Sequence, residues 1–151
     1  MRKFLYIFLL VCGCWDSTKS DGLLHVYVDR VIDGDTFVLK DGRRARLIGI
    51  DTPETVHPRK SSDPHGYLAS NYLKSLIEKN MVIVTFDKQK QDKYGRLLVY
   101  VFFDGVFVNA DLIKRGYGKA VFYYPNTRYK EYFIVLEKLA KQQRIGVWGN
   151  N

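Results

Sequence analysis

The chain has 151 residues, of which 46% are hydrophobic and 15% aromatic, so it is too apolar for a disordered polymer and long enough for one domain with a sizeable core. Its 24 Lys and Arg against 16 Asp and Glu give a formal net charge of +8, which favours polyanions such as nucleic acid or anionic membranes as partners. Charge alone fits a merely soluble basic protein equally well.

The first 14 residues have the pattern of an export signal. Met1–Lys3 is positively charged, and the apolar run 4–11 is much shorter than the about 20 residues of a permanent membrane span. Both cysteines lie in this leader, where residues 10–14 (LVCGC) resemble a bacterial lipobox in which Cys14 would be lipidated. We expect an exported protein, either a cell-envelope lipoprotein attached to the membrane through Cys14 or an ordinary secreted protein.

A short tether and a single domain are expected to follow the leader. Residues 15–22 are mostly polar and small, as in a tether, and the domain is expected over 23–148. Because no cysteine follows position 14, the domain can hold neither an internal disulfide nor a thiolate metal site. Its stability must come from its core and from any ligand that it binds.

Three strands are predicted at the start of the domain. Residues 23–31 are rich in Val and Tyr, and 36–39 continue in the same manner. Asp41 and Gly42 form a strong hairpin signal before a third strand over 44–50. These three strands are expected to form an antiparallel meander.

The pattern after this meander predicts an amphipathic helix, a strand, a polar loop and a second hairpin, over 64–79, 81–86, 87–95 and 97–108. Asn109 is expected to cap a short helix over 110–115, and apolar periodicity predicts a last helix over 127–143. About five short strands with one internal helix and further helices at the end predict an α+β fold. We expect a five-stranded barrel of OB-fold type, an architecture that often binds polynucleotides.

Two acidic segments are candidates for a metal site. Residues 33–36 (DGDT) place two carboxylates around a glycine, for which a plain Asp-Gly turn is the alternative. In residues 51–54 (DTPE), the proline holds its neighbours extended so that backbone carbonyls can face an ion, and helix initiation is the alternative. The carboxylates of Asp35 and Asp51, the Thr52 carbonyl and several waters would form a loose oxygen site suited to calcium.

Two arginines complete a candidate catalytic set. Arg46 shares one face of its predicted strand with large apolar side chains, and Arg96 begins the strand after the polar loop. Phosphodiester cleavage needs planar cations for the phosphate oxygens, a metal to offset charge and a carboxylate near the attacking water. Arg46, Arg96 and Glu54 meet these needs beside the metal ligands, although a simple salt bridge is the alternative for Arg96.

Several motifs occur in the order found in the staphylococcal nuclease family, also called thermonucleases, which the chain resembles over nearly all of residues 23–148. The matching motifs are Val31-Ile32-Asp33-Gly34-Asp35-Thr36, Arg46 followed by Asp51-Thr52-Pro53-Glu54-Thr55, His57-Pro58, Gly66, Phe86-Asp87 and Asp92-Lys93-Tyr94-Gly95-Arg96. The resemblance implies a five-stranded OB-type barrel with three α-helices. It also implies calcium-dependent hydrolysis of DNA and RNA that leaves 3′-phosphate ends.

The same resemblance implies a role for each matched residue. Asp35, Asp51 and the Thr52 carbonyl would bind calcium. Glu54 would activate water, and Arg46 and Arg96 would clamp the phosphate. Lys93 and Tyr94 are expected to contact the substrate, with Tyr94 facing its phosphate. The protein is expected to act as a monomer.

One departure from the family pattern lies at residues 122–125 (FYYP). The family places two tyrosines on either side of a nucleobase, and this chain is one residue shorter there. We expect Tyr124 and either Phe122 or Tyr123 to supply the stacking surface, because a base needs an aromatic face and tolerates loss of the hydroxyl. A core aromatic cluster is the alternative for these three residues.

A different class of function fits the same basic barrel. A nucleic-acid-binding module on the cell surface would use the barrel without cutting. The five charged residues proposed above separate the two, because a non-catalytic relative has little reason to retain all of them together. The three histidines form no ligand cluster in the sequence and are given no role.

Overall fold

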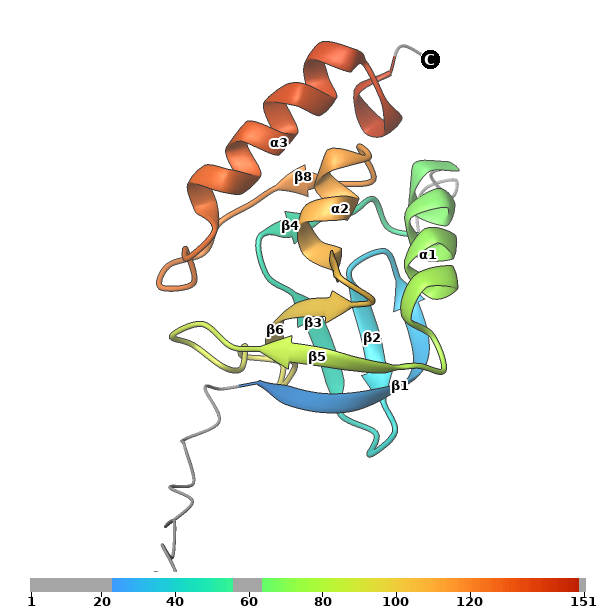
Figure 1. Ribbon diagram of the computed structural model, residues 1–151, viewed down its shortest axis with the longest axis vertical. Helices are drawn as coiled ribbons and strands as arrows, with labels where there is room; N and C mark the ends of the chain where they lie inside the picture. The colour runs from blue at the N-terminus through green and yellow to red at the C-terminus, as the bar shows by residue number, and fades with distance from the viewer. Residues whose placement is uncertain (1–22, 56–63, 150–151) are drawn as a thin grey trace, which may run out of the picture.

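Five strands close into a barrel in the computed structural model, which describes residues 23–55 and 64–149 (Figure 1). The strands are β1, β2, β3, β5 and β6: Leu24–Asp33, Thr36–Leu39, Arg44–Leu47, Met81–Thr85 and Leu97–Phe103. They pair in the order β3-β2-β1-β5-β6, and a parallel pairing of β3 with β6 closes the ring. The expected five-stranded α+β barrel is confirmed.

Parts of the sequence on which expectations rest lie outside the described residues. These are the leader and tether over 1–22, with Cys14, and the His57-Pro58 motif. Among the helices of the described ranges, none is both long and apolar enough to cross a membrane.

The expected meander of β1, β2 and β3 is confirmed, and its register brings two motifs together. Asp33 lies opposite Thr36 across the first turn, and Thr36 in turn lies opposite Arg46 in the β2–β3 pair. Because the residue before Thr36 is Asp35, strand pairing carries this carboxylate to Arg46. The backbone N–H of Leu47 also donates to the Asp35 carbonyl, at 2.9 Å.

The sequence predicted one unbroken third strand over 44–50, and this prediction is wrong. β3 ends at Leu47, Gly49 has a φ of 82°, and a separate strand β4 (Ile50–Asp51) pairs with β8 (Lys119–Ala120). A Cβ on Gly49 would lie 2.4 Å from the Phe133 ring. The chain therefore bends where the last helix approaches it, and the bend redirects Asp51 away from the barrel wall.

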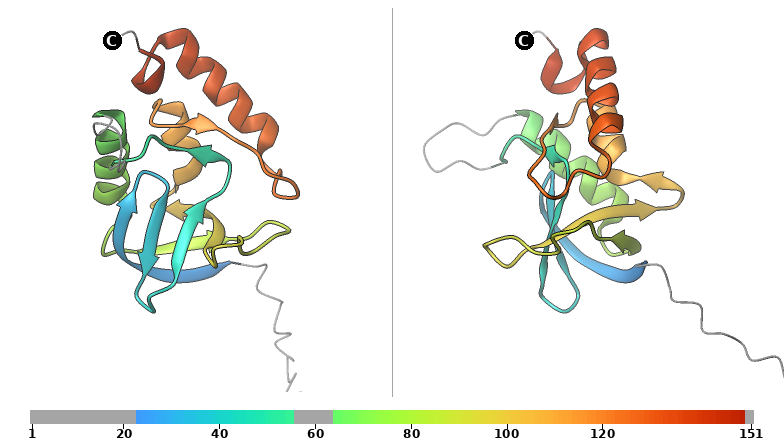
Figure 2. Two further views of the ribbon diagram at one scale, coloured as in Figure 1. Left: turned by 180° about the vertical axis from the view of Figure 1, so that it is seen from behind. Right: turned by 90° about the vertical axis from the view of Figure 1, so that its left-hand side faces the viewer.

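Three α-helices and a 3-10 helix pack beside the barrel. They are α1, α2, α3 and η1: Pro64–Ile77, Val108–Lys114, Lys130–Gln143 and Gly146–Trp148. The expected first and last helices are confirmed with shorter ends. Figures 1 and 2 show α2 between the barrel and α3, so α3 is the outermost helix. Its buried face, which includes Phe133 and Leu136, covers that end of the molecule.

Asn109 does not cap the short helix, contrary to the prediction. The hairpin strand β7 (Val106–Phe107) runs directly into α2, so Asn109 lies within the helix and is fully buried. Its side chain accepts a hydrogen bond from the Val101 N–H at 2.9 Å and donates to the carbonyls of Ile48 and Val99 at 2.9 and 3.2 Å. The amide satisfies backbone groups of β6 and of the residue that follows β3, a long-range role that no local pattern reveals.

Candidate active site

Arg46 joins the two aspartates that the sequence proposed as metal ligands. Its Nη1 lies 2.9 Å from Asp35 Oδ1, and its Nη2 lies 2.8 Å from Asp51 Oδ1. The side chains are 20%, 4% and 55% exposed for Arg46, Asp35 and Asp51. Two carboxylates, one from the β1–β2 turn and one from β4, therefore converge on one cationic group at the edge of the barrel.

The turn that carries Asp35 depends on Gly34. A Cβ at Gly34 would lie 2.6 Å from the Ala69 Cβ of α1 and 2.7 Å from the Thr52 Oγ1, so only glycine fits without displacing its neighbours. Thr36 Oγ1 donates to Asp35 Oδ1 at 2.8 Å, and the Thr52 N–H donates to Asp35 Oδ2 at 3.3 Å. The Asp-Gly turn given as the alternative is thus present, and it also brings Asp35 to Thr52.

Burial governs the charge state of this cluster. Burial raises the pKa of Asp35 to about 6, while the Arg46 guanidinium and the hydrogen bonds from Thr36 and Thr52 act to lower it. Burial acts to lower the pKa of Arg46, but Asp35 and Asp51 outweigh it and the pKa is raised. A buried carboxylate is costly without a cation beside it, so the cluster is built to hold positive charge.

The donor set fits a hard cation. Asp35 and Asp51 each accept a hydrogen bond from the Arg46 guanidinium, which supplies the positive charge beside both carboxylates. No group of three or more His, Cys, Asp or Glu side chains that could hold a metal occurs within 23–55 and 64–149. An ion held there would need backbone oxygen and water to complete its shell, which calcium accepts and softer metals do not favour.

Glu54 follows this cluster on an extended, irregular segment. Residues 52–55 belong to no helix, and the first helix of the described ranges is α1, so the described residues give no support to helix initiation by this segment. A Cβ on Gly66 would lie 2.7 Å from the carbonyl oxygens of both Pro53 and Glu54, so α1 packs directly on this backbone. The Glu54 side chain is exposed, and no described residue forms an ion pair or hydrogen bond with it.

Arg96 is anchored within its own loop. Its Nε donates to Asp92 Oδ2 at 2.7 Å, while Asp92 Oδ1 accepts from the backbone N–H groups of Tyr94 and Arg96 at 2.9 and 3.0 Å. The Tyr94 ring, which is 72% exposed, has the Arg96 guanidinium 5.5 Å and the Lys93 Nζ 5.1 Å from its centre. The salt bridge considered for Arg96 is present, and two cations lie close to the exposed Tyr94 ring.

The pairing of β3 with β6 places the β3 residue Arg46 beside the strand that follows Arg96. Arg46 lies opposite Leu98, and Arg96 precedes Leu98 by two positions. Arg96 itself comes directly before β6 begins at Leu97, and if the alternation of the strand continues to it, we expect it to lie on the same face as Arg46 and Leu98. The register supports the predicted convergence of the clamp.

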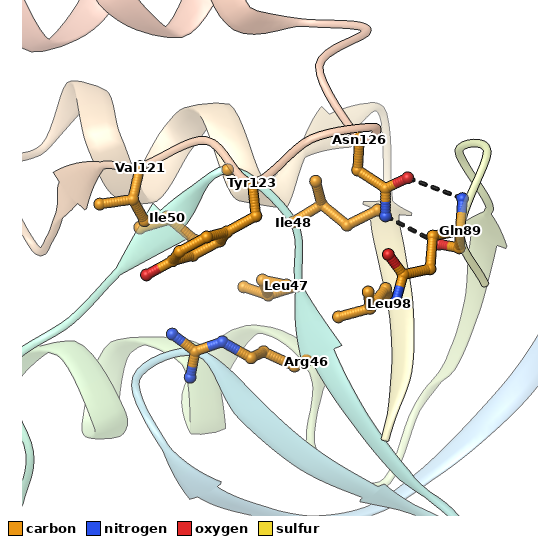
Figure 3. A pocket seen from close by; sticks show the side chains of 10 residues that line it. Arg46, Leu47, Ile48, Ile50, Gln89, Leu98, Val121, Tyr123 and Asn126 are labelled. Carbon is orange, nitrogen blue, oxygen red and sulfur yellow. Dashed lines mark hydrogen bonds between the residues drawn. The ribbon is translucent and has the colours of Figure 1, made fainter. Parts of the chain in front are cut away.

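A shallow apolar hollow adjoins Arg46 (Figure 3). It has a volume of about 50 Å³ and is lined by Arg46, Leu47, Ile48, Gly49, Ile50, Gln89, Leu98, Val121, Tyr123 and Asn126. The Tyr123 ring covers it from the loop after β8, opposite the Arg46 side chain. Of the other candidate stacking residues, Tyr124 is 88% exposed outside the hollow, and Phe122 packs toward Phe133 at a centroid distance of 6.5 Å.

Sequence reasoning missed two residues of this hollow. Asn126, which is 5% exposed, accepts from the Gln89 N–H at 2.8 Å and donates to the Gln89 carbonyl at 2.7 Å (Figure 3). This pair joins the loop that carries Tyr123 to the loop that carries Arg96. The two residues are 37 positions apart, so no local signal could have found the contact.

The chain is similar in sequence to known nucleases. A family described as staphylococcal nuclease homologue matches residues 44–150. The thermonuclease of Staphylococcus intermedius is 42% identical over 80% of this chain and 74% of its own length, and that of Staphylococcus hyicus is 41% identical over 82% and 75%. Endonuclease YncB of Bacillus subtilis (strain 168) is 39% identical over 92% of this chain and 68% of its own length.

Proposed function

We propose that this chain, which belongs to the staphylococcal nuclease family, hydrolyses DNA and RNA in a calcium-dependent reaction that leaves 3′-phosphate ends. Family membership and the nuclease relatives make it a phosphodiester hydrolase. The observation that supports the finer proposal is the Arg46 guanidinium, which forms ion pairs with both Asp35 and Asp51. The net charge of +8 suits a polyanionic substrate.

Each residue of the site has a distinct task in this proposal. Asp35, Asp51 and the Thr52 carbonyl would hold calcium, which when bound offsets negative charge on the phosphate. Glu54 orients or deprotonates the attacking water, a role supported by its exposed side chain, which forms no ion pair or hydrogen bond with the residues that the structure describes. Attack on phosphorus is in line, opposite the leaving oxygen.

The arginines hold the phosphate oxygens during this attack. Arg46 can exchange a carboxylate partner for a phosphate oxygen because both are oxyanions, and its guanidinium stays charged at any working pH. Arg96 is proposed to reach the same phosphate from the end of the β5–β6 loop, which the pairing of Arg46 with Leu98 supports. Lys93 and Tyr94 beside Arg96 contact the substrate phosphate or its neighbour.

The nucleobase next to the cleaved bond is proposed to lie against the hollow. Tyr123 supplies the stacking face, because its ring covers the hollow beside Arg46. Tyr124 is the less favoured candidate, since it lies outside the hollow. The packing of Phe122 toward Phe133 supports the alternative of a core aromatic for that residue alone.

Cleavage of plasmid DNA and of RNA by the purified protein, with calcium or with a chelator, tests the proposal. Calcium should support cleavage, the chelator should abolish it, and phosphatase treatment of end-labelled products should reveal 3′-phosphates. Glu54→Gln should be strongly impaired, whereas the control Glu131→Gln, on the exposed face of α3, should cleave normally. Binding without cleavage would favour the non-catalytic module instead.

An exported location is proposed on the leader sequence alone. Metabolic labelling with a radioactive fatty acid should label the wild type and the Cys12→Ser variant but not Cys14→Ser. Labelling of none of the three, with the protein in the culture medium, would indicate an ordinary secretory signal. Sedimentation of the released domain should give a monomer.

A further inference from the structure

A second pocket lies next to the proposed metal ligands. It is lined by Asp51, Thr52, Pro53, His65, Lys119, Val147 and Gly149. Its volume of about 400 Å³ falls within the roughly 300–1,000 Å³ of small-ligand sites and far exceeds the about 50 Å³ of the hollow beside Tyr123. The two share no lining residue, and they meet at the Arg46–Asp51 ion pair.

Lys119 brings a positive charge to this pocket. It is the direct cross-strand partner of Asp51 in the β4–β8 pair, and its Nζ lies 5.7 Å from the centre of the Trp148 ring. Lys141 lies 4.3 Å from the same ring but is paired with Glu137 at 2.8 Å. Within the described parts of the chain, no carboxylate forms an ion pair with Lys119, so its charge is available to a ligand.

The remaining walls suit a sugar rather than a free ion. Pro53 and Val147 also line the pocket and add apolar surface to the charge of Lys119. A polynucleotide continues on both sides of the bond that is cut. If one nucleotide lies against the hollow beside Tyr123, the strand on the other side of the reacting phosphate leads toward this pocket.

We propose that this pocket is a second nucleotide subsite, in which Lys119 binds the phosphate next to the scissile one and Pro53 and Val147 contact the adjoining sugar. The inference rests on the proposed nuclease function and deepens it. The enzyme should therefore favour substrates that extend past the cleaved bond at one particular end.

Short substrates of defined length test this inference. A dinucleotide with a single phosphodiester is compared with trinucleotides extended at the 5′ or the 3′ end, and kcat/KM is measured for the same bond. Extension at one end should raise kcat/KM about fivefold in the wild type, the size of one exposed ion pair. A neutral methylphosphonate at the added linkage should remove most of that gain.

In the Lys119→Gln variant, extension at the favoured end should no longer raise kcat/KM. The ratio of kcat/KM for that trinucleotide to kcat/KM for the dinucleotide should fall toward one. The matched control Lys114→Gln, an exposed lysine on α2, should keep the ratio of the wild type. An unchanged ratio in Lys119→Gln, or an equal loss on all three substrates, would overturn the subsite.

A binding measurement separates this inference from the proposed activity. Fluorescence anisotropy of a labelled oligothymidylate in chelator gives Kd over a range of salt concentrations. Loss of one phosphate contact should make the slope of log Kd against log salt shallower by about 0.7 in Lys119→Gln. If the wild type fails to cleave with calcium, the proposed function fails and this slope alone decides the subsite.

Discussion

The two arginines of the proposed clamp are anchored in different ways. Arg46 is held by Asp35 and Asp51, which reach it only through strand pairing and the bend at Gly49. Arg96 is held by Asp92, four residues away in its own loop. The first anchorage exists only when the barrel is closed, whereas the second uses contacts that the loop can form locally.

This difference predicts that catalysis and stability are coupled at Arg46 but not at Arg96. Arg46 neutralises a buried carboxylate as well as facing the substrate, so its removal should affect both the fold and the reaction. Arg96 neutralises a carboxylate that also has two backbone N–H donors of its own. Its removal should affect the reaction far more than the fold.

Arg46→Ala should have the largest effect. Loss of a group that acts on the transition state costs on the order of 2.7–4 kcal/mol, so turnover should fall about 100-fold or more. Asp35 would lose its buried cation, which should lower the free energy of unfolding by about 1–3 kcal/mol. Plasmid cleavage rates and urea denaturation measure the two effects.

The matched control is Arg43→Ala, since Arg43 pairs with Asp41 at an exposed turn. It should leave both measurements near those of the wild type. Near-normal turnover in Arg46→Ala would show that Arg46 does not bind the phosphate, and that catalysis and stability are not coupled through this residue.

Arg96→Lys should lower activity while leaving the urea midpoint almost unchanged. Lysine keeps the charge but cannot make paired bonds to phosphate, and bonds to charged groups are worth about 1.5–3 kcal/mol, or about 10- to 100-fold in kcat/KM. Arg115→Lys is the control, because Arg115 forms the same kind of pair with Asp111, four residues away. A large loss of stability in Arg96→Lys would contradict the local anchorage.

Asp87→Asn tests the start of the β5–β6 loop, where Asp87 forms hydrogen bonds with residues far away in the sequence. Asp87 accepts hydrogen bonds from the Tyr100 hydroxyl and the Arg128 N–H, both at 3.0 Å. Burial acts to raise the pKa of Asp87, but the hydrogen bonds outweigh burial and hold the pKa below its usual value. The variant should lose about 1–2 kcal/mol of stability at neutral pH.

The pH dependence of that loss follows from the lowered pKa. The stabilisation is fully present above the unfolded-state pKa of about 3.9 and is lost as pH falls through the lower folded-state value. Urea denaturation should therefore show a gap between wild type and Asp87→Asn at pH 7 that narrows below about pH 4. The exposed Asp104→Asn should show no gap, and a gap for Asp87 that widens in acid would contradict the account.

Asp92→Asn should have the smallest effect. The amide oxygen can still accept from the loop N–H groups, so only the ion pair with Arg96 is lost, worth about two- to fivefold in kcat/KM. Asp41→Asn, at the exposed Arg43 turn, is the control. A loss as large as that of Arg46→Ala would show that the loop has no conformational support beyond this one carboxylate.

Local chemistry explains what could be predicted without the structure. The turns at Asp41-Gly42 and Asp104-Gly105 and the apolar periods of α1 and α3 are short-range signals, so the hairpins and helices were predicted well. The order of the acidic and arginine motifs likewise indicated the family. The roles of Glu54 and of the other proposed site residues stay predictions.

The sequence by itself determined the composition of the site, because ion pairing, hydrogen bonding and charge belong to the residue types Asp, Glu and Arg. Only the tertiary structure decided that one guanidinium spans Asp35 and Asp51, that Asn109 serves the barrel instead of a helix end, and that Tyr123 covers the hollow. Such contacts join residues far apart in the chain. Their geometry depends on how β3, β6 and β8 pack together, which no window of sequence contains.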